Sequence, residues 1–287
     1  ALVMRADGST DNTAEIIGNY CALDSRISQY FDNEAETIGP KASFGKLINS
    51  SLSADCEFIF LCDQDDFWFP EKLKKLINPL RKTITPFLVY SDVELVDDQL
   101  RPLTNKASFR AGNVHRPPEL NDLLSLNTIP GCSIAFNRRL AELATPMPDA
   151  CIMHDWWLAL TAAAVGGIVY VDEPLVSYRQ HQANVIGGRS LLNLVTRFTR
   201  WPELWSKGSI EHGATLNQSQ ELAARLSLMR GGYESEVGIL HQYSELWKNN
   251  RWQRLKIARK LKLRWGQPLQ RMVLYLRLLG RLTQPRP

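Results

Sequence analysis

Short apolar runs alternate with helix-forming stretches over the first two-thirds of the chain, and this alternation limits the possible folds more than any other feature. The apolar runs have the length of buried strands and lie at residues 2–4, 57–62, 87–91, 133–136 and 167–171. Stretches of helical character separate them, at residues 14–20, 45–51, 70–80, 118–126 and 155–165. Strands that alternate with helices predict an α/β domain in three layers, and so few strands argue against a barrel.

The strand signals end at Gly187-Gly188. Residues 190–287 are helical in pattern and contain five of the eight tryptophans. We therefore expect two parts, an α/β domain at residues 1–188 and a helical extension at residues 189–287.

Charge is divided unevenly along the 287 residues. The net charge is +4, yet residues 248–287 hold twelve Lys and Arg and no acidic side chain. The rest of the chain carries 22 basic and 30 acidic side chains, which is a net charge of −8. The chain thus combines an acidic body with a basic tail.

Several protein classes are disfavoured. The five cysteines form no Cys-x-x-Cys pair and are odd in number, which argues against a disulfide framework or a zinc ribbon and favours a reducing cytosol. The longest uncharged apolar stretch, residues 158–171, has fourteen residues, fewer than the roughly 20 that span a bilayer. The first residues show neither a secretory signal nor an initiator methionine, so we expect an N-terminally shortened chain.

An acidic turn, Asp63-Gln64-Asp65-Asp66, directly follows the apolar run at residues 57–62. Ligands of open α/β sheets bind at the carboxyl ends of strands, and alternate carboxylates in a turn can hold one divalent cation. Such a cation neutralises charge on a departing phosphate. The alternative is a solvated acidic turn that precedes the helix beginning at Pro70.

Residues 7–13, Asp-Gly-Ser-Thr-Asp-Asn-Thr, also follow a strand. Asp7 could accept a hydrogen bond from a ring N–H, and Gly8 would let a ligand approach the backbone at a helix start. The alternative is an ordinary turn in which Ser9 or Asp11 caps the following helix.

Two further segments carry polar side chains next to aromatic ones. In His154-Asp155-Trp156-Trp157, the carboxylate could serve as a general base beside a pocket walled by the tryptophans, or it could be a helix cap with two core tryptophans. In Tyr178-Arg179-Gln180-His181, the arginine and the histidine could meet phosphate and metal, or the segment could be a polar loop.

Together these segments resemble family 2 glycosyltransferases, and most of all their bacterial rhamnosyltransferase-like branch. The likeness rests on Asp-Gly-Ser-Thr-Asp-Asn-Thr, Asp-Gln-Asp-Asp-Phe-Trp followed by Pro-Glu-Lys-Leu, Pro-Gly-Cys-Ser before Ala-Phe-Asn-Arg, His-Asp-Trp-Trp, and Tyr-Arg-Gln-His-x-x-Asn-Val. It covers residues 1–188 in the family's own order, and the joint occurrence is far more specific than any single motif.

The resemblance implies an A-type nucleotide-diphospho-sugar transferase fold and an inverting, metal-dependent reaction. Asp7 would face the nucleotide base or ribose, and Asp63 would lie near the ribose. Asp65 would be the direct ligand of Mg²⁺ or Mn²⁺, with His181 near the metal or diphosphate.

The resemblance further implies that Asp155 deprotonates the acceptor hydroxyl as it attacks the anomeric carbon. Gly131 and Cys132 would line the acceptor side of the pocket, which His154, Trp156, Trp157 and Arg179 would complete.

The sequence departs from the family in two places. The family begins with a strand ending in Pro-x-Tyr-Asn and a helix, about 35 residues before the Asp-Gly-Ser segment, and neither is present here. Ala6 stands where an acidic residue is common. We therefore expect a domain that lacks its first strand and helix, and with them one wall of the base pocket.

The basic tail shows helical spacing. Trp252, Leu255, Ala258, Leu261 and Trp265 form an apolar stripe among basic residues, and a second such segment follows Pro268. This pattern suits the surface of an anionic membrane better than nucleic acid, since nothing here resembles a nucleic-acid module. The alternative is a pair of helices packed on the domain with a solvated basic face.

These observations predict transfer of a sugar, by analogy L-rhamnose from dTDP-L-rhamnose, to a lipid-linked saccharide of a bacterial surface polysaccharide such as O-antigen. The protein would work in the cytoplasm, peripherally bound to the inner face of the cell membrane. The rival hypotheses are transfer of a hexose from a UDP-sugar and a catalytically silent, membrane-associated binding module.

Overall fold

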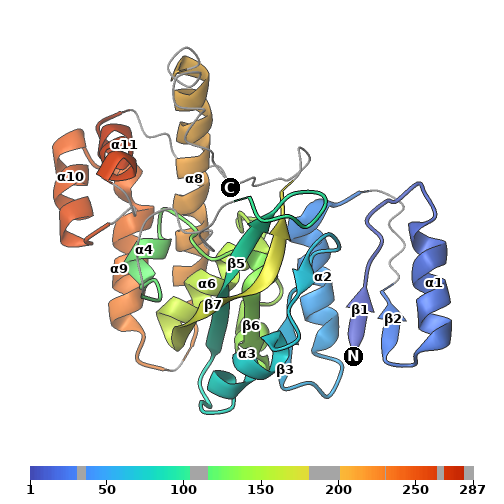
Figure 1. The fold of residues 1–287 in the computed structure, drawn as a ribbon. Helices are drawn as coiled ribbons and strands as arrows, with labels where there is room; N and C mark the ends of the chain where they lie inside the picture. Colours follow the sequence, from blue (N-terminus) through green and yellow to red (C-terminus); the bar gives the residue numbers. More distant parts are fainter. Residues whose placement is uncertain (31–36, 104–115, 181–200, 230, 264–267, 281–287) are drawn as a thin grey trace.

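The computed structural model divides its strands between two sheets (Figure 1). The smaller sheet pairs β1 (Leu2–Met4) in parallel with β2 (Ile27–Gln29), and α1 (Thr13–Leu23) connects them. The larger sheet has five strands in the order β3-β6-β5-β7-β4. The structure describes residues 1–30, 37–103, 116–180, 201–229, 231–263 and 268–280.

The five-stranded sheet is mixed. β5 pairs in parallel with β7 and antiparallel with β6, whereas β3 and β4 add antiparallel strands at the two edges. The strands are β3 (Phe58–Phe60), β4 (Phe67–Trp68), β5 (Phe87–Val96), β6 (Ile134–Asn137) and β7 (Gly167–Arg179).

Helices cover both faces of this sheet, because alternate residues of each strand point to opposite sides. Val89 of β5 packs with Leu76 and Leu80 of α3 (Lys72–Leu80) on one face. Leu88 joins a larger cluster on the other face, which includes α6 (His154–Val165). The expected three-layer α/β architecture is confirmed.

Helix α6 is the central helix of the domain. Ten of its twelve residues are buried, which explains why its sequence, rich in Leu, Ala and Trp, is apolar on all sides. It ends at Gly166, where a β-carbon would lie 1.7 Å from the Pro86 carbonyl oxygen. Only glycine allows the chain to turn there directly into β7.

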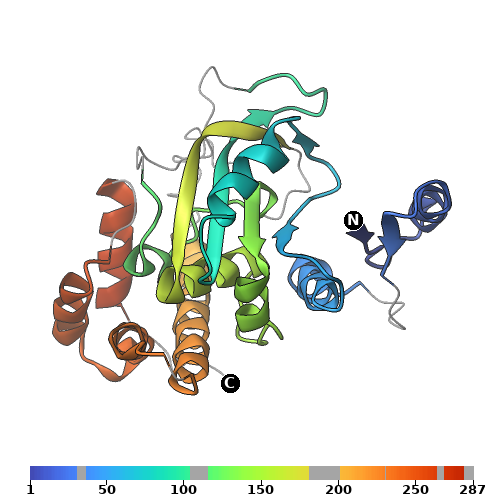
Figure 2. The same cartoon turned by 90° about the horizontal axis from the view of Figure 1, so that it is seen from below.

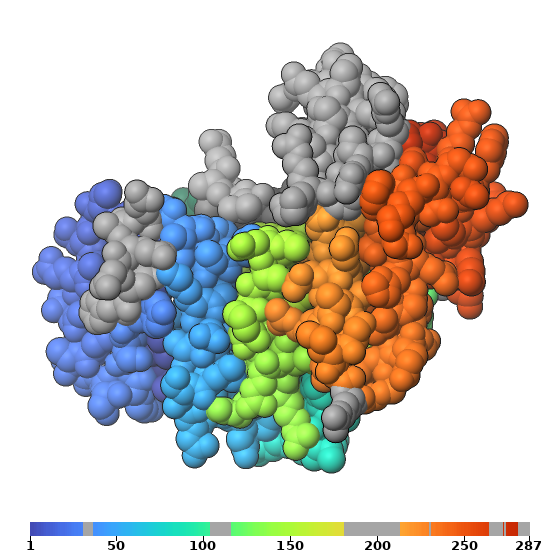
Figure 3. Space-filling view, turned by 180° about the vertical axis from the view of Figure 1, so that it is seen from behind, coloured from blue at the N-terminus to red at the C-terminus, as the bar shows by residue number. Residues whose placement is uncertain are grey.

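Three more helices flank the domain core. α2 (Gly39–Ser51) and α5 (Arg138–Ala144) pack on the α6 side, and α4 (Leu120–Leu123) contacts α6 as well. Seen from behind, α2, the α5 region and α8 (Trp201–Ser227) lie side by side over this surface (Figure 3).

The C-terminal helices share one core with the α/β domain. Leu216, Leu222 and Leu226 of α8 belong to the same apolar cluster as α6. α9 (Glu234–Ser244), α10 (Arg251–Lys260) and α11 (Pro268–Leu279) follow, on the side of the sheet opposite the β1–β2 unit (Figures 1 and 2). The helical C-terminal part is confirmed, whereas a division at residue 188 stays a prediction.

The apolar stripe of the tail faces inward only in part, because its first residue, Trp252, is exposed and Trp265 lies outside the described residues. Ala258, Leu261 and Leu263 are buried, and so are Leu274 and Leu278 of α11. The packed arrangement weighed for these helices is therefore the one the structure shows, with the basic side chains of α10 on its outer surface except for the buried Arg254.

The structure adds elements that local patterns did not indicate. β7 continues from Gly167 to Arg179 rather than ending at residue 171. The strand tolerates Pro174 because this residue lies opposite Asp92 at a register shift, where the regular pattern of backbone hydrogen bonds is interrupted. β2, β4 and α5 are also additions. None of the helices formed by the described residues is both long enough and apolar enough to cross a membrane.

Candidate active site

The acidic turn leaves the larger sheet just after Leu61, whose backbone N–H donates to the carbonyl of Ile134 at 3.3 Å. This contact brings the turn beside the short 3₁₀ turn Gly131–Ser133 that precedes β6. Ligand atoms of Asp63, Asp66 and Cys132 lie within 4.8 Å of one another. Two carboxylates and a thiol from segments far apart in the sequence thus lie close together.

Asp66 has one satisfied and one unsatisfied oxygen. Its Oδ1 accepts a hydrogen bond from the backbone N–H of Arg179 at 3.1 Å. Its Oδ2 is buried and has no N–H or O–H donor in the described structure, and only the weakly donating Cys132 thiol lies beside the carboxylate. A buried carboxylate oxygen without a donor is costly, and a bound cation would supply the missing partner.

The electrostatics of the acidic turn also favour a cation. Burial, with help from the charges of Asp66 and Asp65, raises the pKa of Asp63 to about 6. Burial likewise raises the pKa of Asp66, and it raises the pKa of the Cys132 thiol well above its usual range. Two carboxylates beside a protonated thiol form an oxygen-rich donor set, which suits a hard divalent ion such as Mg²⁺ or Mn²⁺.

Asp155 lies in the first turn of α6, where its Oδ1 accepts the backbone N–H of Trp156 at 2.6 Å. The residue is 7% exposed. Burial is the main reason that its pKa is raised to about 7, and the charge of Asp63 acts in the same direction. A carboxylate whose pKa is near neutrality can take up a proton during turnover, which is the property a general base needs.

Gly131 brings the two halves of the site together. A β-carbon on residue 131 would lie 3.3 Å from the β-carbon of Asp155 and 3.3 Å from Nε2 of His154. His154 is buried and stacks on Phe44 of α2 with ring centroids 4.1 Å apart. Burial lowers the pKa of His154 to about 3, so the imidazole is neutral at physiological pH. Gly131, Cys132, His154 and Asp155 therefore meet as one group.

The two tryptophans after Asp155 have different roles. Trp156 is half-buried, and its indole N–H donates to the Leu123 carbonyl at 2.7 Å. Trp157 is completely buried and donates to the Ala144 carbonyl at 2.9 Å. Trp157 thus belongs to the core, because its ring packs inside the domain and no face of it is exposed to solvent. For this residue the structure agrees with the alternative of a core tryptophan.

Asp7 is bound to helix α2. Its two oxygens accept the backbone N–H groups of Ile38 at 2.9 Å and Gly39 at 2.8 Å, at the start of that helix. Arg5 forms an ion pair with the same carboxylate and donates to Ser43 at 2.8 Å. These donors lower the pKa of Asp7 despite the opposing effect of its burial. The described contacts give Asp7 a role in joining β1 to α2, and its contact with a nucleotide stays a prediction.

Arg179 supports the acidic turn. Its Nε donates to the Asp65 carbonyl at 2.9 Å, and its guanidinium also donates to the Asp98 carbonyl. Asp65 itself is half-buried and lies outside the group of three close ligand atoms. His181, expected near the metal, lies outside the described residues. Arg179 thus holds the backbone of the turn from which the carboxylates project.

Residues 2–142 match the model of the family described as glycosyl transferase family 2. Residues 2–142 therefore form a glycosyl transferase family 2 domain. Uncharacterized proteins of Mycobacterium bovis and Mycobacterium tuberculosis are each 28% identical over 189 residues, covering 63% of this chain and 50% of the relative. The dTDP-rhamnosyl transferase RfbG of Shigella flexneri is 25% identical over 190 residues, covering 63% of each chain. The chain thus spans about half the length of its mycobacterial relatives.

The structure places further residues at this candidate site that the sequence patterns do not single out. Asp66 belongs to the acidic turn, and its ligand atom lies within 4.8 Å of those of Asp63 and Cys132. Lys72 is fully buried below that turn, and its Nζ lies 3.4 Å from the ring centroid of Trp68. The Pro-Glu-Lys-Leu motif contained Lys72, yet an amphipathic helix with several lysines gives no signal that one of them is buried.

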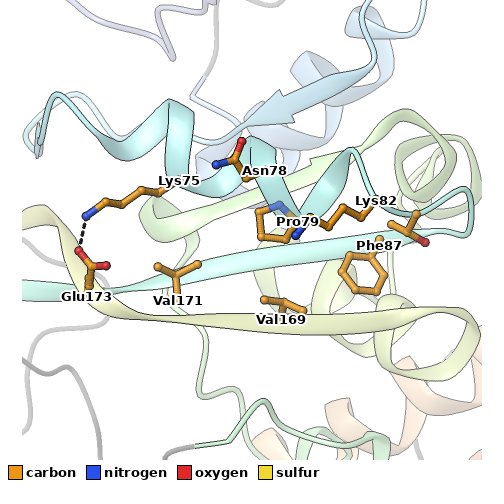
Figure 4. A pocket seen from close by; sticks show the side chains of 9 residues that line it. Lys75, Asn78, Pro79, Lys82, Phe87, Val169, Val171 and Glu173 are labelled. Carbon is orange, nitrogen blue, oxygen red and sulfur yellow. Dashed lines mark hydrogen bonds and ion pairs between the residues drawn. The ribbon is translucent and has the colours of Figure 1, made fainter.

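A groove elsewhere on the transferase domain lies between α3 and the strands β5 and β7 (Figure 4). Its volume is about 440 Å³, and Lys75 and Glu173 form an ion pair across it. Val169, Val171 and Phe87 contribute apolar side chains to its lining. None of the predicted site residues that the structure describes lines this groove, so it is not the site described above.

Proposed function

We propose that this protein transfers a sugar, with inversion, from a nucleotide-diphospho-sugar to a saccharide acceptor. The observation that carries the proposal is the position of Asp155, a buried carboxylate that lies against Gly131 and within electrostatic reach of the acidic turn. The similarity to dTDP-rhamnosyl transferase RfbG supports dTDP-L-rhamnose as the donor. A lipid-linked saccharide of a bacterial surface polysaccharide is the proposed acceptor.

Asp155 is the proposed general base. In its ionised form it accepts the proton of the acceptor hydroxyl while the hydroxyl oxygen attacks the anomeric carbon from the face opposite the diphosphate. The neutral His154 beside it supplies no positive charge to stabilise the carboxylate, so the pKa of Asp155 stays raised. Burial of Asp155 limits access of water, which would otherwise compete with the acceptor hydroxyl.

Asp63 and Asp66 are the proposed holders of Mg²⁺ or Mn²⁺, with Asp65 and His181 as the further candidates named from the sequence. The unpartnered Oδ2 of Asp66 and the raised pKa of Asp63 support this proposal. When bound, the cation would neutralise charge on the departing diphosphate. Asp63 and Asp7 are proposed to contact the ribose and the base of the donor.

The direct test measures release of nucleoside diphosphate from dTDP-L-rhamnose and a panel of UDP-hexoses, with Mg²⁺ or Mn²⁺ and a saccharide acceptor. We expect wild-type turnover with dTDP-L-rhamnose. Asp155→Asn should lower turnover about 10²-fold or more while the donor binds nearly as before, because shape is kept and basicity is lost. Asp55→Asn, a change at an exposed aspartate, is the matched control and should keep full turnover.

The same panel separates the rival functions. Turnover with a UDP-hexose alone would replace the rhamnosyl donor while keeping the mechanism. Donor binding without turnover by the wild type would indicate a silent binding module. Equal turnover by wild type and Asp155→Asn would remove Asp155 from the mechanism.

We also propose that α10 meets an anionic membrane surface, on the cytoplasmic side of the cell membrane. Four of its five basic side chains are exposed, whereas Ala258 of its apolar stripe is packed inside, so the charged face is available to a partner. Trp252 on this helix is 62% exposed, as expected of an aromatic ring that settles among lipid headgroups. The exposed basic residues are Arg251, Lys256, Arg259, Lys260 and, just after the helix, Lys262.

Vesicle flotation tests the membrane proposal. The triple change Lys256→Glu, Arg259→Glu and Lys260→Glu should release the protein from vesicles that contain phosphatidylglycerol, because each basic residue near such a surface contributes about 1 kcal/mol. A matched triple change on exposed residues near α3, namely Lys74→Glu, Arg81→Glu and Lys82→Glu, should leave binding unchanged. If both triple variants bind the vesicles equally well, α10 is not the part of the protein that contacts the membrane.

A further inference from the structure

Lys72 stands out because its position breaks two general preferences. It is the first residue of α3, where the helix dipole disfavours a positive charge. Its side chain is 0% exposed, although lysine is among the residues least often fully buried. Local preferences are most often violated where a residue serves a site rather than the fold.

Lys72 contacts a backbone carbonyl and an aromatic ring. Its Nζ donates to the carbonyl oxygen of Cys132 at 2.6 Å and lies over Trp68. Among the described residues, no carboxylate forms an ion pair with it. The main polar contact of the buried amino group is therefore its hydrogen bond to the Cys132 carbonyl, which holds Cys132 in place.

Cys132 sits at the centre of the site. Its thiol is close to the carboxylates of Asp63 and Asp66, and the preceding residue, Gly131, lies against Asp155. The turn Gly131–Ser133 thus fills the space between the proposed cation ligands and the proposed base. A displacement of this turn would act first on Asp155, because Asp66 is also held by the backbone N–H of Arg179.

We propose that Lys72 is a positioning residue, whose bond to the Cys132 carbonyl fixes the Gly131–Ser133 turn between the acidic turn and Asp155. It acts through Cys132 and Gly131 and touches neither donor nor acceptor. Its effect on turnover rests on the proposed function, whereas its effect on the turn does not.

The test replaces Lys72 with methionine, which has a similar length but no donor. Hydrogen exchange of peptides that cover residues 127–137 should become faster, and turnover should fall about tenfold or more with little change in the KM for the donor. The affinity for Mn²⁺ alone, measured by calorimetry, should be unchanged or higher, because a positive charge near Asp63 and Asp66 is lost. Lys74→Met, on the exposed side of the same helix, should change none of these values.

Lys72→Gln provides a second variant, because its amide can still donate to Cys132 without a charge. It should restore slow exchange and part of the turnover, and it carries the test if Lys72→Met does not fold. Unchanged exchange in the 127–137 peptides, or weaker Mn²⁺ binding in a folded Lys72 variant, would overturn the proposal. If the wild type turns over no donor, the proposed function fails, while the exchange measurement still decides the role of Lys72.

Discussion

Gly131 and Asp155 lie so close that a side chain at residue 131 would press against Asp155 and His154. A β-carbon there would be 3.3 Å from the Asp155 β-carbon and 3.5 Å from its Oδ2. The backbone of Gly131 does not have a positive φ, so close approach rather than backbone conformation explains the glycine. The turn before β6 therefore fixes where the carboxylate of Asp155 can lie.

Gly131→Ala should lower turnover about tenfold while the melting temperature changes by only a few degrees. The added methyl group must push Asp155 or His154 aside by a few tenths of an ångström, and His154 is held between Gly131 and Phe44. Small misplacements of a reacting group are costly to rate. Steady-state kinetics and thermal melts measure the two effects.

The matched control is Gly18→Ala in α1, where an added β-carbon would meet no atom within 4 Å. This variant should keep wild-type turnover and should be as stable as the wild type or slightly more so, because alanine favours helix. Turnover of Gly131→Ala equal to that of the control would show that the Gly131–Asp155 contact is unimportant for rate.

The rate should depend on pH through Asp155. Its pKa is raised to about 7, and only the ionised carboxylate can accept the acceptor proton. Turnover should therefore rise as pH increases from about 6 to about 8, with its midpoint near the pKa of about 7, and level off above that range. A cation at the acidic turn would offset the charge of Asp63 and shift the rise to lower pH. A profile without this rise would contradict the assignment of Asp155.

Stability should fall as pH rises from about 4 towards 7. Asp63 and Asp155 have folded-state pKa values of about 6 and about 7, above the 3.8 of the unfolded chain. In this range the folded state binds more protons than the unfolded chain. The stabilisation that these protons provide is complete below about pH 4, and it is lost as the pH rises through the raised pKa values. Thermal melts at several pH values measure how steeply the melting temperature falls as pH rises. This slope should be smaller in the double variant Asp63→Asn, Asp155→Asn than in the wild type.

Mn²⁺ should raise the melting temperature more at pH 7.5 than at pH 5. Protons compete with the cation for Asp63, and the cation relieves the cost of the buried charges once they ionise. Asp66→Asn should remove most of the shift at pH 7.5, because Oδ2 of Asp66 is the oxygen without a partner. An equal shift at both pH values in the wild type would argue against binding at this turn.

Arg179→Met should weaken Mn²⁺ binding without removing a ligand. The guanidinium of Arg179 supports the Asp65 carbonyl, and without it the acidic turn is less well ordered. Calorimetry should show a several-fold lower affinity. Arg26→Met, at a side chain that is 82% exposed, is the control and should bind Mn²⁺ as the wild type does.

Deleting residues 248–287 should cause aggregation rather than simple release from membranes. The deleted segment contributes buried apolar residues to the shared core, and Arg254 donates hydrogen bonds to the carbonyls of Leu246, Trp247 and Gly280. The loss would uncover apolar surface on α9. Light scattering of the truncated protein measures the outcome, and a monomeric, cooperatively folded product would contradict it.

The sequence alone determined the class of fold and the main chemical groups. Residue periodicity reports which face of a segment is apolar, so the strand and helix order and the α/β class could be predicted from it. The acidic turn, Asp155 at a helix start and the family resemblance were likewise visible, because each depends on residues adjacent in the chain.

Only the tertiary structure decided which of these residues meet. Lys72 looks like any lysine of a basic helix until α3 packs below the Cys132 carbonyl, and Trp156 and Trp157 look alike until α6 is buried. The roles proposed for Asp66 and Cys132 depend on a contact between segments more than sixty residues apart. The physical reason is that local patterns record which surfaces avoid water, whereas strand register and close packing determine which distant atoms come within bonding distance.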